Sequence, residues 1–330
     1  MAQFEIENVM YLPSGRIFLL RSGDQIIEAT EMRDVSVDGK LHEEVRNSLD
    51  PHVIWRHLVD FEQKWLMTVS TQYGCPHKCQ FCDVGNMAFC GNLSFKEISD
   101  QICMILDNTP YVKKCDKAKI GFARMGEPAH NLENVLNVIR YLPVISAGYD
   151  REFNWLPCFN TILPRKCKFS PEEVLVRVTE VKENDYEGFL HFQLSCNSTD
   201  EEKRRELFGG SGIMSIEEIV AFFSDVELTN RTITLNFIVM KDVEVSVDKL
   251  KKMGLNADKF RVKLIPLNNT IAKQTNNLET FANYSNYEDL LALKDEFEKA
   301  GIPVVVDAIA KCEEAGLCCG QLAQVFMKQE

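Results

Sequence analysis

The sequence predicts an α/β fold built on a parallel sheet. Short runs of β-branched and aromatic residues alternate with segments whose apolar residues recur at helical spacing. About six such strand–helix units span roughly 250 residues, as in a partial or complete barrel. Hydrophobic residues make up 45% of the 330 residues and charged residues 26%, which is a globular composition. We therefore expect a partial (β/α)6 barrel of the TIM type with a small N-terminal β-rich extension.

The N-terminal extension is predicted from three strand-like runs separated by Pro-Ser-Gly and Ser-Gly-Asp turn signals. These runs are residues 4–12, 16–22 and 25–32. Residues 34–64 are polar and charged, with a short helical or packing segment at 53–61. The pattern changes at Trp65, so we divide the chain into a β-rich accessory region, 1–64, and a barrel core, 65–330.

Strands and helices are expected to alternate through the core. The expected strands are residues 66–71, 119–125, 152–160, 189–196, 232–240, 260–267 and 302–308. The expected helices are residues 93–107, 131–142, 170–181, 215–226, 247–254 and 287–301. Ser94 with Glu97 three residues later is a capping box, and Ser170 followed by proline is a typical helix start. Strands joined through helices pair in parallel.

Composition also bounds the function. No run of 18 apolar residues suggests a membrane span, and the N-terminus has no secretory pattern, so we expect a cytoplasmic protein. The formal charge of −12 argues against a broad, nonspecific nucleic-acid binder. Two local basic groups are interpreted as solvated faces: residues 203–205, and a group made of Lys113, Lys114 and Lys117.

Three cysteines are gathered in one short loop, GCPHKCQFC, where Cys75, Cys79 and Cys82 have the spacing C-x3-C-x2-C. Clustered thiols in a reducing compartment typically bind metal. A structural zinc site needs four ligands, and His77 inside the loop is the candidate fourth ligand of a Cys3His site. The alternative is a 4Fe–4S cluster, in which three cysteines leave one iron open to a small molecule.

This spacing on a loop after the first barrel strand, with Phe81 before the last cysteine, resembles the signature of the radical S-adenosylmethionine (SAM) enzymes. The resemblance implies a 4Fe–4S cluster held by Cys75, Cys79 and Cys82, with SAM on the open iron. It implies that reductive cleavage of SAM yields a 5′-deoxyadenosyl radical, which abstracts a hydrogen atom. It also implies a reductant such as flavodoxin or ferredoxin.

Further stretches resemble the RlmN/Cfr-type adenine C-methyltransferases over most of the chain. RMGEPAHN is similar to the family's GMGEP-x-x-N. The resemblance implies that Gly126 and Glu127 bind SAM and that Glu127 accepts a hydrogen bond from the SAM amino group. FQLSCNSTDEEKRREL is similar to the family's SLHA segment with a later arginine, which is Arg204 here. The resemblance implies that Ser195, and Asn197 in place of the family's histidine, bind SAM. VKLIPLN is similar to LIPWN and implies that Asn268 contacts SAM. Taken alone, RMGEP also fits an ordinary helix N-terminal turn.

The stretch GLCCGQLA is similar to the family's cysteine before Gly-Gln-Leu, and Cys319 occupies that position. The resemblance implies that Cys319 is catalytic: it receives a methyl group from one SAM, and a second SAM supplies the radical that activates the methyl carbon. Addition to an electron-poor adenine carbon then joins enzyme and substrate. The alternative is that Cys318 and Cys319 form a vicinal buried or metal-binding pair.

One departure from the family lies at Thr68, where the family has a cysteine that breaks the covalent adduct. A hydroxyl group cannot form the disulfide that this step requires. Three explanations are open. Another thiol, Cys318 or Cys90, takes the role, or a different substrate allows the adduct to break by elimination without a thiol. The third is that the chain catalyses another radical reaction on the same scaffold. The separate helical N-terminal domain of longer family members, which contributes to RNA capture, is not found in this sequence.

Three functions are consistent with these features. The leading hypothesis is a radical SAM C-methyltransferase acting on adenine in RNA. The second keeps the scaffold but moves the chemistry to a nucleotide-like small molecule, which suits the acidic charge. The third is a cluster-binding sensor without turnover, against which the presence of Cys319 argues.

Overall fold

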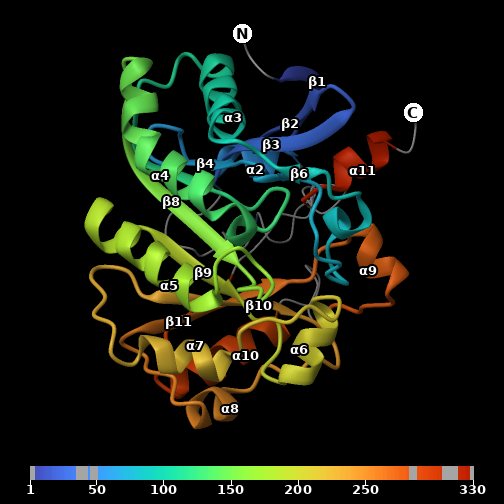
Figure 1. Cartoon of the computed structure of the whole chain (residues 1–330), viewed down its shortest axis with the longest axis vertical. Coiled ribbons are helices and arrows are strands. Elements are labelled where there is room, and N and C mark those ends of the chain that lie inside the picture. The colour runs from blue at the N-terminus through green and yellow to red at the C-terminus, as the bar shows by residue number, and fades with distance from the viewer. Residues whose placement is uncertain (1–3, 35–43, 45–50, 282–287, 307–318, 328–330) are drawn as a thin grey trace.

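The computed structural model describes residues 4–34, 44, 51–281, 288–306 and 319–327. Within these residues, one sheet of ten strands runs through the molecule in the order β1-β2-β3-β4-β7-β8-β9-β10-β11-β12 (Figure 1). Strand order follows chain order across the whole sheet, so each connection joins neighbouring strands. This order is the one expected when each crossover packs a helix against the sheet.

The N-terminal strands are β1 (Glu5–Tyr11), β2 (Gly15–Ser22) and β3 (Gln25–Arg33). They form an antiparallel meander, as the sequence predicts. β3 also pairs antiparallel with the first core strand, so that Thr30 stands opposite Thr68. The accessory strands therefore continue the core sheet. The boundary after residue 64 stays a prediction.

The core strands are all parallel to one another, which confirms the predicted α/β class with a mostly parallel sheet. They are β4 (Trp65–Thr68), β7 (Lys114–Gly121), β8 (Glu152–Thr161), β9 (His191–Ser195), β10 (Ile233–Val239), β11 (Phe260–Pro266) and β12 (Val304–Val306). Residues 307 and 308 of the last predicted strand lie outside the described residues.

The helices predicted between these strands are present. The helices of the described chain are α2 (Pro51–Arg56), α3 (Phe95–Asn108), α4 (Leu132–Gly148), α5 (Pro171–Glu180), α6 (Glu201–Leu207), α7 (Ile216–Phe223), α8 (Val247–Lys252), α9 (Ile271–Thr275), α10 (Glu288–Lys299) and α11 (Gln321–Met327). The short turns are η1 (Asp83–Asn86), η2 (Pro128–Asn131) and η3 (Val181–Asp185), and β5 (Gln72–Tyr73) pairs with β6 (Gly91–Asn92). α6, α9 and α11 were not predicted, because two turns or fewer carry almost no periodic signal.

The predicted capping box begins α3. Ser94 Oγ accepts from the backbone N–H of Glu97 at 3.2 Å, and Glu97 Oε2 accepts from the backbone N–H of Ser94 at 2.7 Å. Ser170 caps α5 in the same way with Glu173, and proline follows as predicted. Both boxes satisfy amide groups that the first helical turn leaves unpaired.

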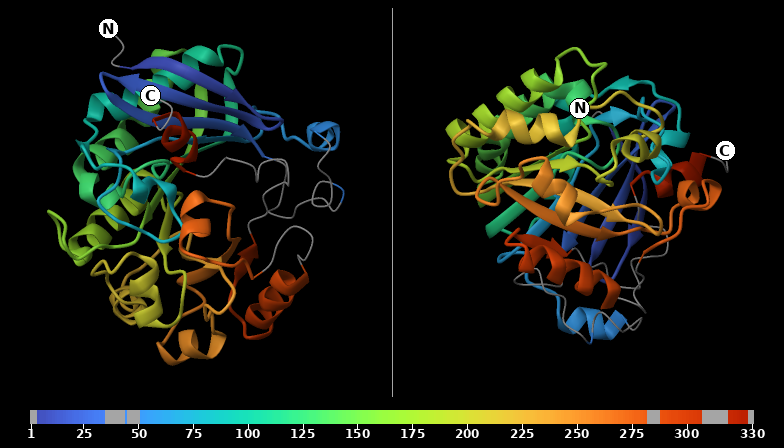
Figure 2. Two further views of the ribbon diagram at one scale, coloured as in Figure 1. Left: turned by 90° about the vertical axis from the view of Figure 1, so that its right-hand side faces the viewer. Right: turned by 90° about the horizontal axis from the view of Figure 1, so that it is seen from below.

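The two faces of the core sheet differ in chemistry. One face packs against the outer helices: Phe192 and Phe260 both contact Phe223 of α7, at ring-centroid distances of 6.3 and 5.7 Å. Because side chains alternate along a strand, the next residues face away from these helices. We call that second face the inner face. Figure 2 shows that α11 lies beside the β1–β3 strands, far from α7.

Candidate active site

The cysteine loop follows the first core strand and connects β5 to η1. Two neighbouring elements hold it in place. The backbone N–H of Gln80 donates to Leu207 O at the end of α6, at 2.8 Å. The buried carboxylate of Asp83 accepts from the backbone N–H groups of Ile271 and Ala272, at 3.2 and 2.7 Å, and so caps α9. The loop is therefore fixed on both sides.

The three thiols lie close enough for their charges to act on one another. Burial raises the pKa of Cys75 to about 12, and the charges of Cys82 and Glu127 add to the increase. Burial likewise raises the pKa of Cys79 well above its usual value, with the charges of Cys82 and Cys75 contributing. Burial and the charge of Cys319 raise that of Cys82 to about 12. Thiols that oppose one another's ionisation are a donor set suited to a cationic metal group.

The ring of His77 contacts residues other than the three thiols. Its Nδ1 lies 2.8 Å from Ser211 Oγ and its Nε2 lies 2.8 Å from Nε2 of His130, so both ring nitrogens are engaged. His130 Nδ1 in turn lies 3.2 Å from Cys167 Sγ. In the described part of the chain, no three His, Cys, Asp or Glu side chains converge as ligands of a single metal ion.

Glu127 lies beside the cysteine loop, buried at the start of η2. Its Oε1 accepts from the backbone N–H of Ala129 at 3.0 Å, and its Oε2 accepts from that of Ile162 at 3.1 Å. The preceding Gly126 has φ +101°, and a Cβ there would lie 2.7 Å from the Cβ and Cγ of Gln72. Only glycine fits this position. The carboxylate of Glu127 is thus held by two backbone N–H groups.

The other residues predicted to bind SAM lie at the same end of the parallel sheet. Ser195 ends β9, and Asn268 follows β11; both are half-buried. Asn197 is buried with φ 62°, and its Oδ1 accepts from the backbone N–H of Ile238 at 3.0 Å. Its Nδ2 is buried and has no hydrogen-bond partner among the described residues. A buried amide nitrogen without a partner fits a site that receives a polar ligand.

Cys319 comes close to the cysteine loop from the other end of the chain. Its Sγ lies 3.5 Å from Ala123 O, just beyond β7. The next residue, Gly320, has φ +76°, and a Cβ there would lie 2.4 Å from Cγ2 of Val84 in η1. Glycine therefore allows the Cys319 segment to pack directly on the residues that follow Cys82. Its partner in the predicted vicinal pair, Cys318, lies outside the described residues.

A buried ion pair, which the sequence analysis did not anticipate, holds Cys319 in place. Arg124 Nη2 lies 2.6 Å from Glu28 Oε2, and Arg124 Nη1 lies 3.9 Å from Cys319 Sγ. Glu28 also accepts from the backbone N–H groups of Gly320, at 3.0 Å, and Ala323, at 2.8 Å. Arg124 takes the place of the first glycine of the family's GMGEP motif. The ion pair is therefore not a part of that motif. That departure was the only sequence signal available for it.

Replacing Arg124 with leucine is expected to destabilise the fold by about 3–5 kcal/mol, because it leaves Glu28 buried without its cation. Urea denaturation measures this change. The double variant Arg124→Leu, Glu28→Leu should lose less than the single one, because no unpaired charge remains. Arg165→Leu is the control: its pair with Glu218 is exposed and is worth about 0–1 kcal/mol. Equal losses at both sites would contradict the assignment.

Glu127 should make stability depend on pH. Burial raises its pKa from 4.5 to about 7, against opposing bonds from Thr161 and two backbone N–H groups. A raised acid pKa stabilises the fold below pH 4.5, and that contribution is lost as the pH rises to about 7. In cluster-free protein, the unfolding free energy of the wild type relative to Glu127→Gln should therefore fall across this window. A pH-independent difference would refute the assignment.

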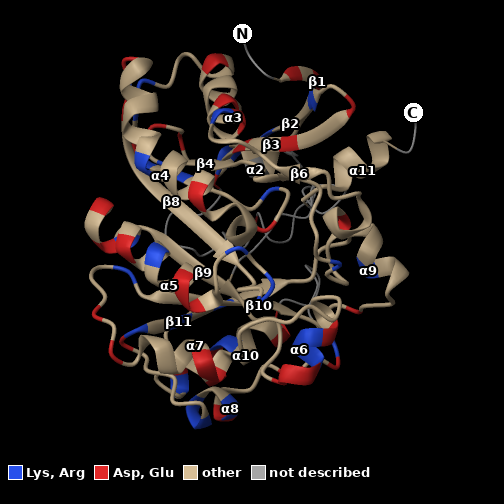
Figure 3. Cartoon of the chain, viewed as in Figure 1, with Lys and Arg blue, Asp and Glu red and all other residues tan. Residues whose placement is uncertain are grey.

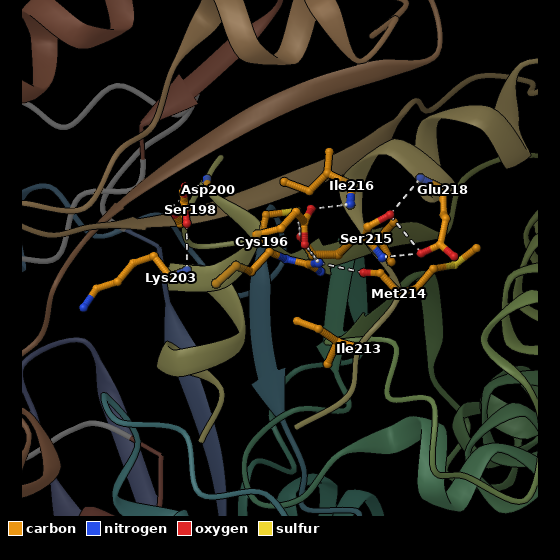
Figure 4. A network of polar contacts seen from close by, with 12 residues as sticks. Cys196, Ser198, Asp200, Lys203, Ile213, Met214, Ser215, Ile216 and Glu218 are labelled. Carbon is orange, nitrogen blue, oxygen red and sulfur yellow. Dashed lines mark hydrogen bonds and ion pairs between the residues drawn. The ribbon is translucent and has the colours of Figure 1, made fainter. Parts of the chain in front are cut away.

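Arg204, which matches the family's arginine, is buried rather than part of a solvated basic face. Its Nη1 donates to Met214 O at 2.6 Å and to Glu201 Oε2 at 3.1 Å. Glu201 Oε1 accepts from the backbone N–H of Ile216 at 2.8 Å. Figure 4 shows this network between α6 and the start of α7. The interpretation of residues 203–205 as a surface group is therefore wrong for Arg204, which holds the segment after β9 in place.

The residue at the missing thiol position has a well-defined environment. Thr68 Oγ1 lies 2.6 Å from Thr30 Oγ1 across the β3–β4 pair. Of the two thiols considered as substitutes, Cys90 is exposed and donates to Ala88 O at 3.8 Å, and Cys318 lies outside the described residues. Neither is placed beside Thr68 by the described structure.

The outer surface carries acidic and basic side chains mixed over most helices (Figure 3). In the parts of the chain that the structure describes, no helix has the length and apolar character needed to cross a membrane.

Comparison with known proteins identifies relatives. A protein of Aquifex aeolicus described as a probable dual-specificity RNA methyltransferase RlmN is 26% identical over 224 residues, or 66% of this chain and 60% of its own length. A Clostridioides difficile protein of the same description is 25% identical over 316 residues, or 92% of this chain and 84% of the relative. No protein-family model matches the sequence.

A solved structure shares the fold. A radical SAM methyltransferase from Sphaerobacter thermophilus superposes with a TM-score of 0.68 at 18% identity, covering 97% of this chain and 81% of the other. The resemblance predicted from the sequence is thereby confirmed: the chain is related in sequence to RlmN-type RNA methyltransferases and has the fold of a radical SAM methyltransferase.

Proposed function

We propose that the protein is a radical SAM enzyme that transfers a methyl group to adenine in RNA through Cys319. The observation that carries the proposal is the contact between the two ends of the site. Gly320 packs against Val84 of η1, and the charge of Cys319 acts on Cys82. A methyl-carrying thiol must lie beside the place where a radical is generated, and this packing provides that proximity.

The residues fit the cofactors that such chemistry needs. Cys75, Cys79 and Cys82 would hold a 4Fe–4S cluster, with SAM occupying the iron that has no protein ligand. When bound, these groups supply reductive cleavage of SAM and hydrogen-atom abstraction. Glu127 would accept a hydrogen bond from the SAM amino group, and two backbone N–H groups that orient its carboxylate support this role.

Three further residues complete the proposed SAM site at the carboxyl ends of the core strands. The hydroxyl of Ser195 and the amides of Asn197 and Asn268 are proposed to bind polar atoms of SAM. Asn197 has a buried Nδ2 that needs an acceptor, which a ligand oxygen would provide. The ends of parallel strands are where α/β barrels bind their substrates.

Arg124 and Glu28 have a separate role in this proposal. The guanidinium group attracts a thiolate at Cys319 and orients it, while Glu28 fixes both the guanidinium and the backbone of Gly320. Burial raises the pKa of Cys319; the charge of Arg124 opposes this increase and the charge of Glu28 adds to it. Arg124 would therefore favour the thiolate, the nucleophilic form of cysteine that takes up a methyl group from SAM. Arg124 is therefore a positioning residue.

The experiment is anaerobic reconstitution with iron, sulfide, SAM and a reductant such as flavodoxin. The proposal expects 5′-deoxyadenosine, S-adenosylhomocysteine and a Cys319 peptide that is heavier by one methyl group in place of hydrogen. RNA from cells with and without the gene, digested and examined for 2- or 8-methyladenosine, tests the substrate. Protein that holds the cluster and never cleaves SAM would overturn the proposal.

A nucleotide-like small molecule is the second candidate substrate. The observation that favours it is the net charge of −12, which suits a small substrate better than a nucleic acid. Thr68 adds to this alternative, because the adduct formed with another substrate would not have to be resolved by a thiol at that position.

A further inference from the structure

The inner face of the sheet carries basic side chains that the proposed mechanism does not use. Phe192 and Phe260 point toward Phe223 of α7. Because side chains alternate along a strand, the residue before Phe192 and the residue after Phe260 point to the opposite face. His191 and Arg261 are these neighbours. Both are only half-buried in strands whose helix-facing residues are fully buried.

Strand register places His191 and Arg261 on either side of β10. His191 stands opposite Cys158 of β8, and its neighbour two residues along the same face is Gln193. Gln193 stands opposite Thr234, and Thr234 stands opposite Arg261. Arg261 Nε donates to Thr234 Oγ1 at 2.8 Å, which directs the guanidinium toward β10. The two basic residues thus occupy adjacent rows of the inner face.

Three further cations face this pair. Lys117 and Lys119 lie on β7, and Arg231 immediately precedes β10. Burial lowers the pKa of His191, and the charges of Lys119, Arg231, Arg261 and Lys117 lower it further. Burial also lowers the pKa of Arg231, with the charge of Arg261 adding to the effect. Four basic side chains therefore act on one imidazole.

Carboxylates also lie near this group: Asp116, Asp185 and Glu187 line the same pocket as Lys117 and Arg231. Burial is the largest cause of the lowered pKa of Lys117, and the charge of Asp34 opposes it. Asp34 also forms an ion pair with Lys64. Lys64 itself acts on Lys117 as another positive charge. Like charges in a partly buried space repel one another, and a bound anion offsets that repulsion.

The surroundings of the basic group are polar rather than packed with apolar side chains. Asn236 Nδ2 donates to Gln193 Oε1 at 3.0 Å, and Gln193 Nε2 donates to Cys158 Sγ. Asn236 is 8% exposed, and its Oδ1 has no partner among the described residues. The same holds for His191 Nε2 and Arg231 Nε. Buried polar atoms of this kind require a partner, and a polar ligand supplies one.

We propose that the inner face holds an anion site for the phosphate of a small nucleotide. Arg231 and Arg261 bind the phosphate oxygens, since guanidinium groups pair with phosphate through parallel N–H bonds. Lys117, Lys119 and His191 add charge or N–H donors, and Asn236 Oδ1 accepts from the ligand. His191, Arg231 and Arg261 stand at the amino ends of their strands, whereas the proposed SAM residues stand at the carboxyl ends. The anion site is therefore separate from the proposed function.

The test uses the full chain without cluster or SAM. Adenosine 5′-monophosphate, inorganic pyrophosphate, adenosine and a short RNA are compared as ligands by calorimetry and thermal unfolding. The proposal expects the monophosphate and pyrophosphate to bind and to raise the melting temperature, with adenosine much weaker. Absence of binding by every phosphate compound would overturn it. Binding of the RNA alone would also overturn it, because it would mean that the outer surface carries the phosphate contacts.

Matched variants separate an anion site from a structural role. Arg261→Gln should weaken binding of the monophosphate by about tenfold or more. It should also raise the melting temperature of the ligand-free protein, because a repelling charge is removed. Arg261→Lys should retain part of the affinity. A lower melting temperature in Arg261→Gln with unchanged binding would show that Arg261 only supports the fold.

A control variant on β7, the strand of Lys117 and Lys119, tests for a nonspecific effect of charge. Lys114 is exposed on β7 and lies 3.4 Å from Glu152, so Lys114→Gln should leave binding unchanged. Equal losses in Lys114→Gln and Arg261→Gln would indicate a nonspecific charge effect and overturn the site. These measurements need no turnover. A failure here leaves the methyltransferase proposal standing, and a failure of SAM cleavage leaves the anion site standing.

Discussion

Cys79→Ala protein is expected to hold no iron–sulfur cluster and to form no 5′-deoxyadenosine from SAM. Three thiols are the whole donor set that the loop offers, so the loss of one leaves the proposed cluster with two protein ligands. Iron and sulfide content, visible absorbance and 5′-deoxyadenosine are the measurements. The expected loss is complete, because every later step depends on SAM cleavage.

Cys103→Ala is the matched control for that variant. Cys103 is half-buried in α3, away from the loop, and its removal should leave cluster content and SAM cleavage intact. A Cys79→Ala protein that retained stoichiometric iron and normal 5′-deoxyadenosine formation would show that the loop is not the cluster site. The zinc alternative predicts instead that the wild-type protein contains zinc after anaerobic purification.

Cys319→Ala protein should keep its cluster and lose all methylated product. The thiol is the proposed acceptor of the first methyl group, and alanine cannot carry it. Mass spectrometry should find no methylated peptide from the C-terminal segment, and S-adenosylhomocysteine should fall to background. Iron content should match that of the wild type, because Cys319 is not a proposed ligand.

Cys90→Ala gives the comparison, since Cys90 is exposed and is one of the two thiols considered for resolving the adduct. Normal product from this variant would remove Cys90 from that role without affecting Cys319. Product formation by Cys319→Ala at the wild-type rate would contradict the methyl-carrier proposal, whatever the substrate.

The sequence predicted those parts of the fold that local chemistry determines. The Ser94–Glu97 capping box and the Ser170 helix start lie where they were expected, because side chains three residues apart determine each. The alternation of strands and helices predicted the parallel sheet for the same reason. The cysteine loop was found because its thiols are neighbours in the chain.

The pair Glu28–Arg124 was not predicted, and the reason is physical. Glu28 lies in β3 and Arg124 lies in the loop after β7, and no neighbouring residue in the sequence indicates that they form an ion pair. Arg204 shows the same limit from the other side: it lies in a charged stretch that indicates a solvated helix, yet tertiary packing buries it against Met214 O. The basic inner face was also missed, because strand register, not spacing, gathers its residues.

The bonds from Glu28 to Gly320 and Ala323 have a consequence for how the molecule assembles. They join residues 292 and 295 positions apart, so nearly the whole chain forms one closed loop. Closing a loop of this length is entropically unfavourable until the strands between its ends are in place. We expect Cys319, the proposed methyl acceptor, to reach its final position late in folding. An incompletely folded chain would then be inactive in methyl transfer.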